Sequence, residues 1–268
     1  MSPTSVDPAL PRFPHLPSTV GILGAGRAGT ALARALARIP RLHPWIAAPD
    51  VVMAATRRPA AVQRHLGIYA PEAVAVAPED LAQAELTVVA VPREALDDVD
   101  PAWFAGPATR AVVDMTNTWE AEPLPDWMDP HDGDPRLGTE RLAARWAAAG
   151  LTAPLVRAFS EISHHDLGVA GRTEAPRWAL AIGTERHTDG GGHALPGGRE
   201  RLRARDTVID LVHAMGFDGV VYQGFEEGVR LEPGGPAFGS GGDLEELSRR
   251  MSSSPEWPDA RPDAWPRE

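Results

Sequence analysis

The chain has 268 residues, of which 43% are hydrophobic, and a formal net charge of −11 at pH 7. This length predicts one ordinary domain with a small appendage, and the acidic balance argues against a general binder of nucleic acid or anionic membranes. The sequence has neither Cys nor Lys, which excludes thiol catalysis, thiolate–zinc sites, disulfides and Schiff-base chemistry. No apolar run approaches a membrane span and the proline-rich N-terminus lacks the features of a secretory signal, so we expect a cytoplasmic protein.

From residue 18 onward, apolar segments alternate with helix-forming segments. Strands are predicted at 19–23, 50–56, 73–77, 85–91, 110–115, 155–160, 178–182 and 219–222, and helices at 27–39, 59–66, 78–84, 93–99, 139–149 and 199–215. Several strands are nearly continuous apolar runs, which suit a parallel sheet covered on both faces. The pattern predicts an α/β fold: a Rossmann-like, doubly wound, mostly parallel sheet with a small C-terminal α/β extension.

The segments that do not follow this alternation of strands and helices predict the domain organisation. Residues 1–17 are predicted to be an irregular N-terminal segment, and residues 18–239 a Rossmann-type domain with a C-terminal α/β cap. Residues 120–138, rich in Pro and Asp, are expected to form a surface insertion. From residue 240 we expect a disordered tail with one short helix candidate near 243–251, followed by Trp257 and Trp265.

The most informative motif is Gly24-x-Gly26-x-x-Gly29, which lies between an apolar run and a string of strong helix formers. Strand, glycine turn and helix in this order are the context of a dinucleotide-binding fingerprint. The first Gly permits a tight turn, the second lets a pyrophosphate approach the backbone, and the third lets the helix pack closely on the strand. The first-turn N–H groups would face the diphosphate. The alternative is a purely structural strand-to-helix turn.

The end of the second strand favours NADP over NAD. An NAD site usually has Asp or Glu there for the ribose 2′-hydroxyl, but this strand ends in Thr56-Arg57-Arg58. Guanidinium groups suit a 2′-phosphate through charge-assisted hydrogen bonds, and the Thr56 hydroxyl can add a donor. Asp50 opens the strand and so lies at the wrong end. Alternatively, both arginines are ordinary solvated residues.

The next two strands end in loops at the same sheet edge, where open α/β folds bind ligands. Val91-Pro92-Arg93 follows the fourth strand, and Met115-Thr116-Asn117 closes the fifth. These loops are predicted to line the nicotinamide side of the cleft. For any single residue, an equal alternative is that it only ends the strand and begins a loop.

The succession of these motifs resembles the coenzyme F420-dependent NADP oxidoreductase family. The resemblance runs from about residue 19 to 238, and its more discriminating parts are Ala158-Phe159-Ser160 and Leu231-Glu-Pro-Gly-Gly-Pro236. In that family a hydride passes between NADPH and the deazaflavin F420, so no catalytic acid, base or nucleophile is expected. The β-hydroxyacid dehydrogenases have a similar fingerprint, but their mechanism needs a lysine and they carry a large helical C-terminal domain.

The resemblance implies roles for particular residues of this chain. Within the glycine turn, from Gly24 to Gly29, the pyrophosphate would be held by Ala25, Gly26, Arg27 and Ala28. Thr56 and Arg57 would hold the 2′-phosphate with Arg58 close by, and Pro92, Arg93, Met115, Thr116 and Asn117 would flank the nicotinamide ribose. Ser160, Ile162 and His164 would face the deazaflavin. Two departures from the family are a Ser at 160, where some members have His, and the 120–138 insertion.

Some alternatives stay open at this stage. His164-His165-Asp166 can be a helix start, can place one histidine against the second substrate, or can bind a metal; no further His/Asp set at metal-ligand spacing supports the metal. The acceptor can be F420, or another oxidant such as a ferric chelate or quinone. A third possibility is a non-catalytic NADP(H) sensor that binds a partner through its Trp-bearing tail. Otherwise the expected partners are a small-molecule cosubstrate and, as an open alternative, a second copy of the chain.

Overall fold

The computed structural model describes residues 12–119, 123–128, 136, 138–189, 191–239 and 241–253. Most of the predicted 120–138 insertion, as well as Trp257 and Trp265, lies outside these residues. All eight predicted strands are present, with ends that differ from the predictions by a few residues at most. They are β1 (Thr19–Leu23), β2 (Asp50–Ala54), β3 (Val74–Ala75), β4 (Leu86–Val89), β5 (Ala111–Asp114), β6 (Leu155–Ala158), β7 (Ala179–Thr184) and β8 (Asp218–Gln223).

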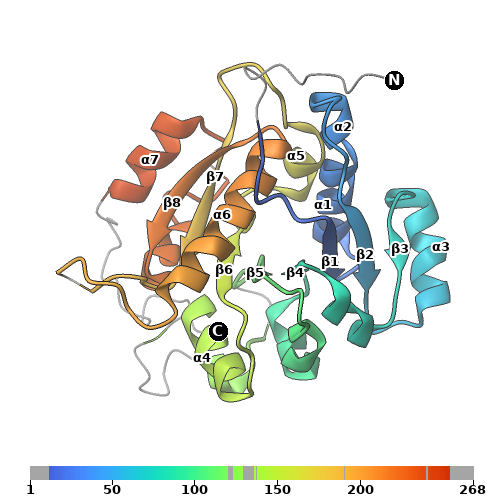
Figure 1. The fold of residues 1–268 in the computed structure, drawn as a ribbon, viewed down its shortest axis with the longest axis horizontal. Helices are drawn as coiled ribbons and strands as arrows, with labels where there is room; N and C mark the ends of the chain where they lie inside the picture. The colour runs from blue at the N-terminus through green and yellow to red at the C-terminus, as the bar shows by residue number, and fades with distance from the viewer. Residues whose placement is uncertain are drawn as a thin grey trace, which may run out of the picture.

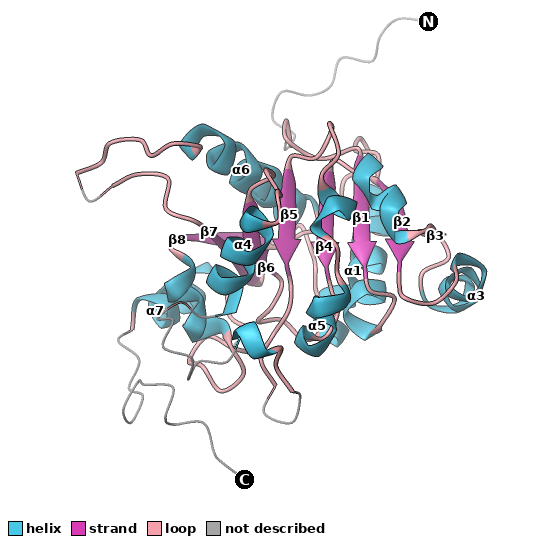
Figure 2. Cartoon of the chain, turned by 90° about the horizontal axis from the view of Figure 1, so that it is seen from below, coloured by secondary structure: helices cyan, strands magenta, loops and turns pink. Residues whose placement is uncertain are grey.

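The eight strands form one sheet in the order β3-β2-β1-β4-β5-β6-β7-β8. Every neighbouring pair is parallel except β6 and β7, which run antiparallel. Figure 2 shows the central strands side by side, with α3 near one end of the sheet and α7 near the other. The order reverses between β1 and β4, which is the switch point where doubly wound folds bind nucleotides. The predicted mostly parallel, doubly wound α/β sheet is confirmed.

The helical elements cover both faces of the sheet (Figure 1). The α-helices are α1 (Arg27–Ala37), α2 (Ile39–Leu42), α3 (Pro59–Tyr69), α4 (Gly138–Ala148), α5 (His164–Val169), α6 (Gly198–Ala214) and α7 (Leu244–Ser252). The 3₁₀ helices are η1 (Pro78–Gln83), η2 (Arg93–Asp98), η3 (Pro101–Phe104), η4 (Asp126–Met128) and η5 (Phe225–Leu231). The helices expected at 78–84 and 93–99 are therefore 3₁₀, consistent with their brevity. Within the described segments, no helix has the length and apolar character needed to cross a membrane.

Alternate side chains of each strand enter cores on opposite faces. Ile22 of β1 and Val88 of β4 pack in the larger core, with residues of α1, α3 and α6. Leu23 and Val89, one residue further on, pack in the core of the other face against η1, η3 and α4. Strands that bury both faces need apolar residues throughout, which explains the continuous apolar runs of the sequence.

The C-terminal helix changes the predicted tail boundary. α7 forms at the expected place and packs on β7 and β8, where Leu247 is fully buried and Met251 is 9% exposed. Asp243 caps the helix by accepting a hydrogen bond from the Glu246 N–H at 3.1 Å. The predicted helix near 243–251 is thus part of the folded domain, because its apolar face packs on β7 and β8.

Candidate active site

The glycine turn between β1 and α1 is built by close backbone contacts. Gly24 has φ +122°, and a Cβ there would lie 2.3 Å from the carbonyl oxygen of Ala90. A Cβ on Gly29 would lie 1.9 Å from the carbonyl oxygen of Gly24, so α1 packs directly on the turn. Gly is therefore required at both positions, for the turn and for the helix contact.

Gly26 differs from its two neighbours in the motif. A Cβ at this position would meet no atom within 4 Å, so no protein packing requires Gly here. Gly26 is also the N-cap of α1, has no capping side chain, and precedes a first turn without acidic residues. The positive end of the helix dipole and its free N–H groups thus face open space, as an anionic pyrophosphate requires.

Thr56, Arg57 and Arg58 follow β2 and are all exposed. The Gly24 N–H donates to the Ala54 carbonyl oxygen at 2.8 Å, so the glycine turn lies against the end of β2. In the described part of the chain, neither guanidinium pairs with a carboxylate. Two unneutralised cations therefore lie next to the turn, as a 2′-phosphate site requires.

Arg93 begins η2 after the β4 loop, and its side chain points into the protein rather than toward solvent. It is 2% exposed, and Nε donates to Thr116 Oγ1 at 3.0 Å. Its other nitrogens bond Thr118 Oγ1 and, at 2.8 Å, Glu232 Oε1. The donors of this guanidinium are therefore bound within the protein, and the place of Arg93 beside the nicotinamide ribose stays a prediction.

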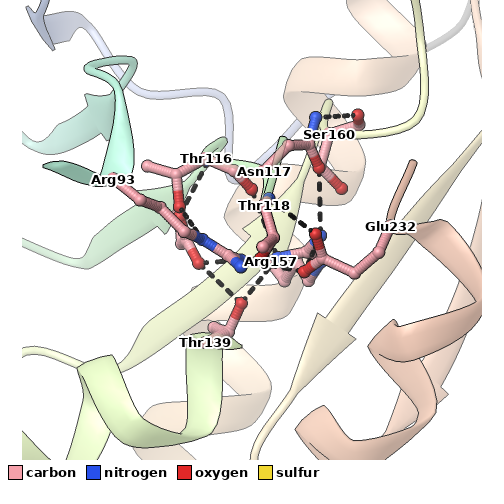
Figure 3. A network of polar contacts seen from close by, with 9 residues as sticks. Arg93, Thr116, Asn117, Thr118, Thr139, Arg157, Ser160 and Glu232 are labelled. Atoms are coloured by element: carbon pink, nitrogen blue, oxygen red, sulfur yellow. Dashed lines mark hydrogen bonds and ion pairs between the residues drawn. The ribbon is translucent and has the colours of Figure 1, made fainter. Parts of the chain in front are cut away.

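Arg157 of β6 is a second buried cation in the same network (Figure 3). Its Nη2 lies 3.0 Å from Glu232 Oε1, and its Nη1 donates to Thr139 Oγ1 at 2.8 Å. Nη1 also lies 3.7 Å from Asp114 Oδ2, directly across the β5–β6 ladder. Two arginines and two carboxylates thus balance in charge, as buried ions require.

Glu232 joins three segments that are distant in sequence. It binds both arginines, and its Oε2 accepts the Thr118 N–H at 2.9 Å. Burial opposes ionisation of Glu232, but Arg93 and Arg157 outweigh this effect and hold its pKa below the usual range. The Leu231–Pro236 segment is therefore fastened to the loops after β4 and β5, and positions them.

The loop after β5 is held from both sides. The Thr116 N–H donates to Asp114 Oδ1 at 2.8 Å, and Asn117 Nδ2 donates to the Ser160 carbonyl oxygen at 2.6 Å. Met115, Thr116 and Ser160 are buried. The structure therefore brings the predicted nicotinamide loop and the predicted acceptor segment into direct contact.

The acceptor segment begins with an unusual backbone conformation. Phe159 is buried and has φ +64°, a left-handed value that costs a residue with a Cβ about 1 kcal/mol. This turn follows the last residue of β6 and leads to Ser160 and Glu161. Strain of this kind is often found at functional sites, which fits the prominence of Ala158-Phe159-Ser160 in the sequence.

His164 and His165 lie exposed in the first turn of α5. The helix is capped by Ser163, whose Oγ accepts the Asp166 N–H at 3.1 Å, so His164 and His165 stand at a helix start, one of the alternatives left open by the sequence. Among the described residues, no group of three or more His, Asp or Glu side chains could hold a metal ion. A contact between a histidine and a second substrate stays a prediction, as do the other ligand contacts.

Comparison with known families finds a match over the segment that contains the predicted nucleotide-binding residues. Residues 19–118 match the model of the family described as NADP oxidoreductase, coenzyme F420-dependent. The resemblance is confirmed over this segment. It contains the glycine turn, the end of β2 and both predicted nicotinamide loops. No curated protein matches the chain significantly.

Three solved structures share the fold. A hypothetical protein from Sinorhizobium meliloti is 21% identical, with a TM-score of 0.60 over 83% of this chain and 93% of its own. A protein from Arthrobacter sp. FB24, provisionally named an F420-dependent NADP-reductase, is 20% identical, with a TM-score of 0.53 over 78% and 86%. Glycerol-3-phosphate dehydrogenase from Saccharomyces cerevisiae is 13% identical, with a TM-score of 0.50 over 82% and 60%. The family and the fold together support an NADP-dependent oxidoreductase.

Sequence reasoning missed Arg157 and Glu232 as partners. The sequence could have predicted an ion pair at Arg157, because a charge inside the apolar strand Leu155–Ala158 needs a buried counter-charge. Glu232 was seen only as part of a family-like segment. Its partners lie 75 and 139 residues away in the chain, beyond the reach of local patterns.

Proposed function

We propose that this protein transfers a hydride between NADP(H) and a deazaflavin of the F420 type. The observation that carries the proposal is the pairing of an open helix N-terminus at Gly26 with unpartnered cations at Arg57 and Arg58. The backbone around Gly26 would hold the pyrophosphate, and Thr56 with the two arginines would hold the 2′-phosphate. The bound nucleotide would supply the hydride, and the chain would position the two rings.

The proposal that F420 is the hydride acceptor has two supporting observations. The family that residues 19–118 match is named for F420, and the segment from Ser160 to His164 lies beside the nicotinamide loop through the Asn117–Ser160 bond. A chain without Lys and Cys suits this reaction, because hydride exchange between two cofactors needs no side-chain acid or nucleophile.

Stopped-flow mixing with NADPH tests the proposal. We expect the NADPH absorbance to decay on mixing with F420, and more slowly or not at all with a ferric chelate or a quinone. Decay with the chelate or quinone but not with F420 would move the assignment to a reductase of that acceptor. NADPH binding without turnover of any acceptor would instead favour a nucleotide sensor.

A further inference from the structure

An exposed tryptophan stands directly after the nicotinamide loop. Trp119 is 45% exposed, the highest value among the exposed tryptophans of the described chain. Its indole packs edge-on against Phe238, with ring centroids 5.6 Å apart and planes at 82°. Large exposed aromatic side chains on an anchored backbone commonly mark binding sites, because they offer a wide apolar surface at low entropic cost.

The Trp119–Phe238 pair lies where three segments meet. On one side, Asn117 Nδ2 binds the Ser160 carbonyl oxygen at 2.6 Å. On the other, the N–H of Gly239, next to Phe238, donates to the Glu161 carbonyl oxygen at 2.8 Å. The pair therefore adjoins both the loop predicted to flank the nicotinamide and the segment predicted to face the acceptor.

The backbone that carries Trp119 is fixed by the buried ion network. The preceding residue, Thr118, donates its N–H to Glu232 and accepts from Arg93 through its hydroxyl. Gly239, the residue after Phe238, also lines a cavity of about 80 Å³ together with Ile162 and Ser163 of the predicted acceptor segment, while Trp119 and Phe238 lie outside that lining. A ligand that binds here meets an aromatic surface whose support is already ordered.

We propose that Trp119, supported by Phe238, is the stacking surface for a planar, fused-ring hydride acceptor and determines the enzyme's specificity among acceptors. The proposal rests on the proposed function, since it places the acceptor beside the loop predicted to flank the nicotinamide. A flat heteroaromatic ring gains dispersion and π contacts on an indole, whereas a ferric chelate without a flat π surface does not. Trp119 thus favours deazaflavins and fused-ring quinones over metal chelates.

Calorimetric titration of oxidised F420 into the NADP⁺-saturated protein tests the inference. Loss of a base–aromatic stack predicts that Trp119→Ala weakens F420 binding by about 5- to 100-fold. Trp119→Phe should retain most of the affinity. The matched control is Trp45→Ala, at a tryptophan that is 37% exposed, precedes β2 and packs on His43; it should bind F420 like the wild type. All three variants should bind NADPH equally and keep the wild-type Tm.

The failures of the two proposals are distinguishable. Wild-type F420 affinity in Trp119→Ala, or equal weakening in Trp45→Ala, would overturn the role of Trp119 while leaving hydride transfer intact. Parallel loss of NADPH affinity or of Tm would show that Trp119 is only structural. The rate of NADPH decay with a ferric chelate, whatever its wild-type value, should not change in Trp119→Ala; a fall equal to that for F420 would contradict selection by stacking. A wild type that binds no F420 would overturn both.

Discussion

Arginines at or near the ends of three strands of the sheet are in opposite states. Next to the glycine turn, Arg57 and Arg58 are exposed and pair with no carboxylate in the described chain. Farther along the sheet, after β4 and in β6, Arg93 and Arg157 are buried and balanced by Asp114 and Glu232. The first pair has its charge available for an anionic ligand, and the second holds loops in place. Because the chain has no lysine, the presence or absence of a partner carboxylate, and not the residue type, distinguishes these two roles.

The largest effect is expected at the buried network. Glu232→Gln removes one of two negative charges that neutralise Arg93 and Arg157, and should lower the free energy of unfolding by about 3 kcal/mol. Urea denaturation followed by circular dichroism measures this change. Glu227→Gln, which breaks the more exposed ion pair with Arg230, is the matched control and should cost less than about 1 kcal/mol. Equal losses in the two variants would mean that the network does not support the fold.

The glycine turn offers a comparison within one motif. Gly26→Ala places its Cβ in open space, so we expect unchanged Tm but NADPH affinity lower by about tenfold or more, since the methyl group occupies the space predicted for the pyrophosphate. Gly29→Ala forces the backbone apart and should cost about 1–3 kcal/mol of stability. Thermal denaturation and NADPH titration separate these outcomes. Normal NADPH binding by Gly26→Ala would contradict a pyrophosphate site at this turn.

The smallest effect concerns the pH dependence of stability. Burial raises the pKa of the Glu161 carboxyl, although the Ala181 N–H and Arg157 oppose this shift. The folded state therefore binds this proton more tightly than the unfolded state. Stability from this group is complete below the ordinary Glu pKa and is lost as pH rises through the raised folded pKa. Glu161→Gln should flatten this part of the stability profile, and a slope that persists unchanged would assign it to another group.

The sheet could be predicted because its evidence is local. Apolar segments, several of them nearly continuous, marked the strands, and the glycine spacing marked the switch-point turn that the structure confirms. The antiparallel direction of β7 gave no local signal, because it depends on how the chain returns after α5. The ion pair of Arg93 gave no local signal for a similar reason. Its position at a strand end predicted a place near the ligand, and only the distant Glu232 shows that its charge is neutralised.

The central claim is that the unpartnered arginines after β2 bind the 2′-phosphate of NADP(H). Titrating NADPH and NADH into Arg57→Glu tests it most directly. The account predicts that NADPH affinity falls by about tenfold to a thousandfold, through loss of a charge-assisted contact and new repulsion, while NADH affinity changes much less. Arg199→Glu, the same charge change at an exposed residue of α6, should leave both affinities near wild type. Unchanged NADPH affinity in Arg57→Glu, or equal loss for both nucleotides, would contradict a 2′-phosphate site at the end of β2.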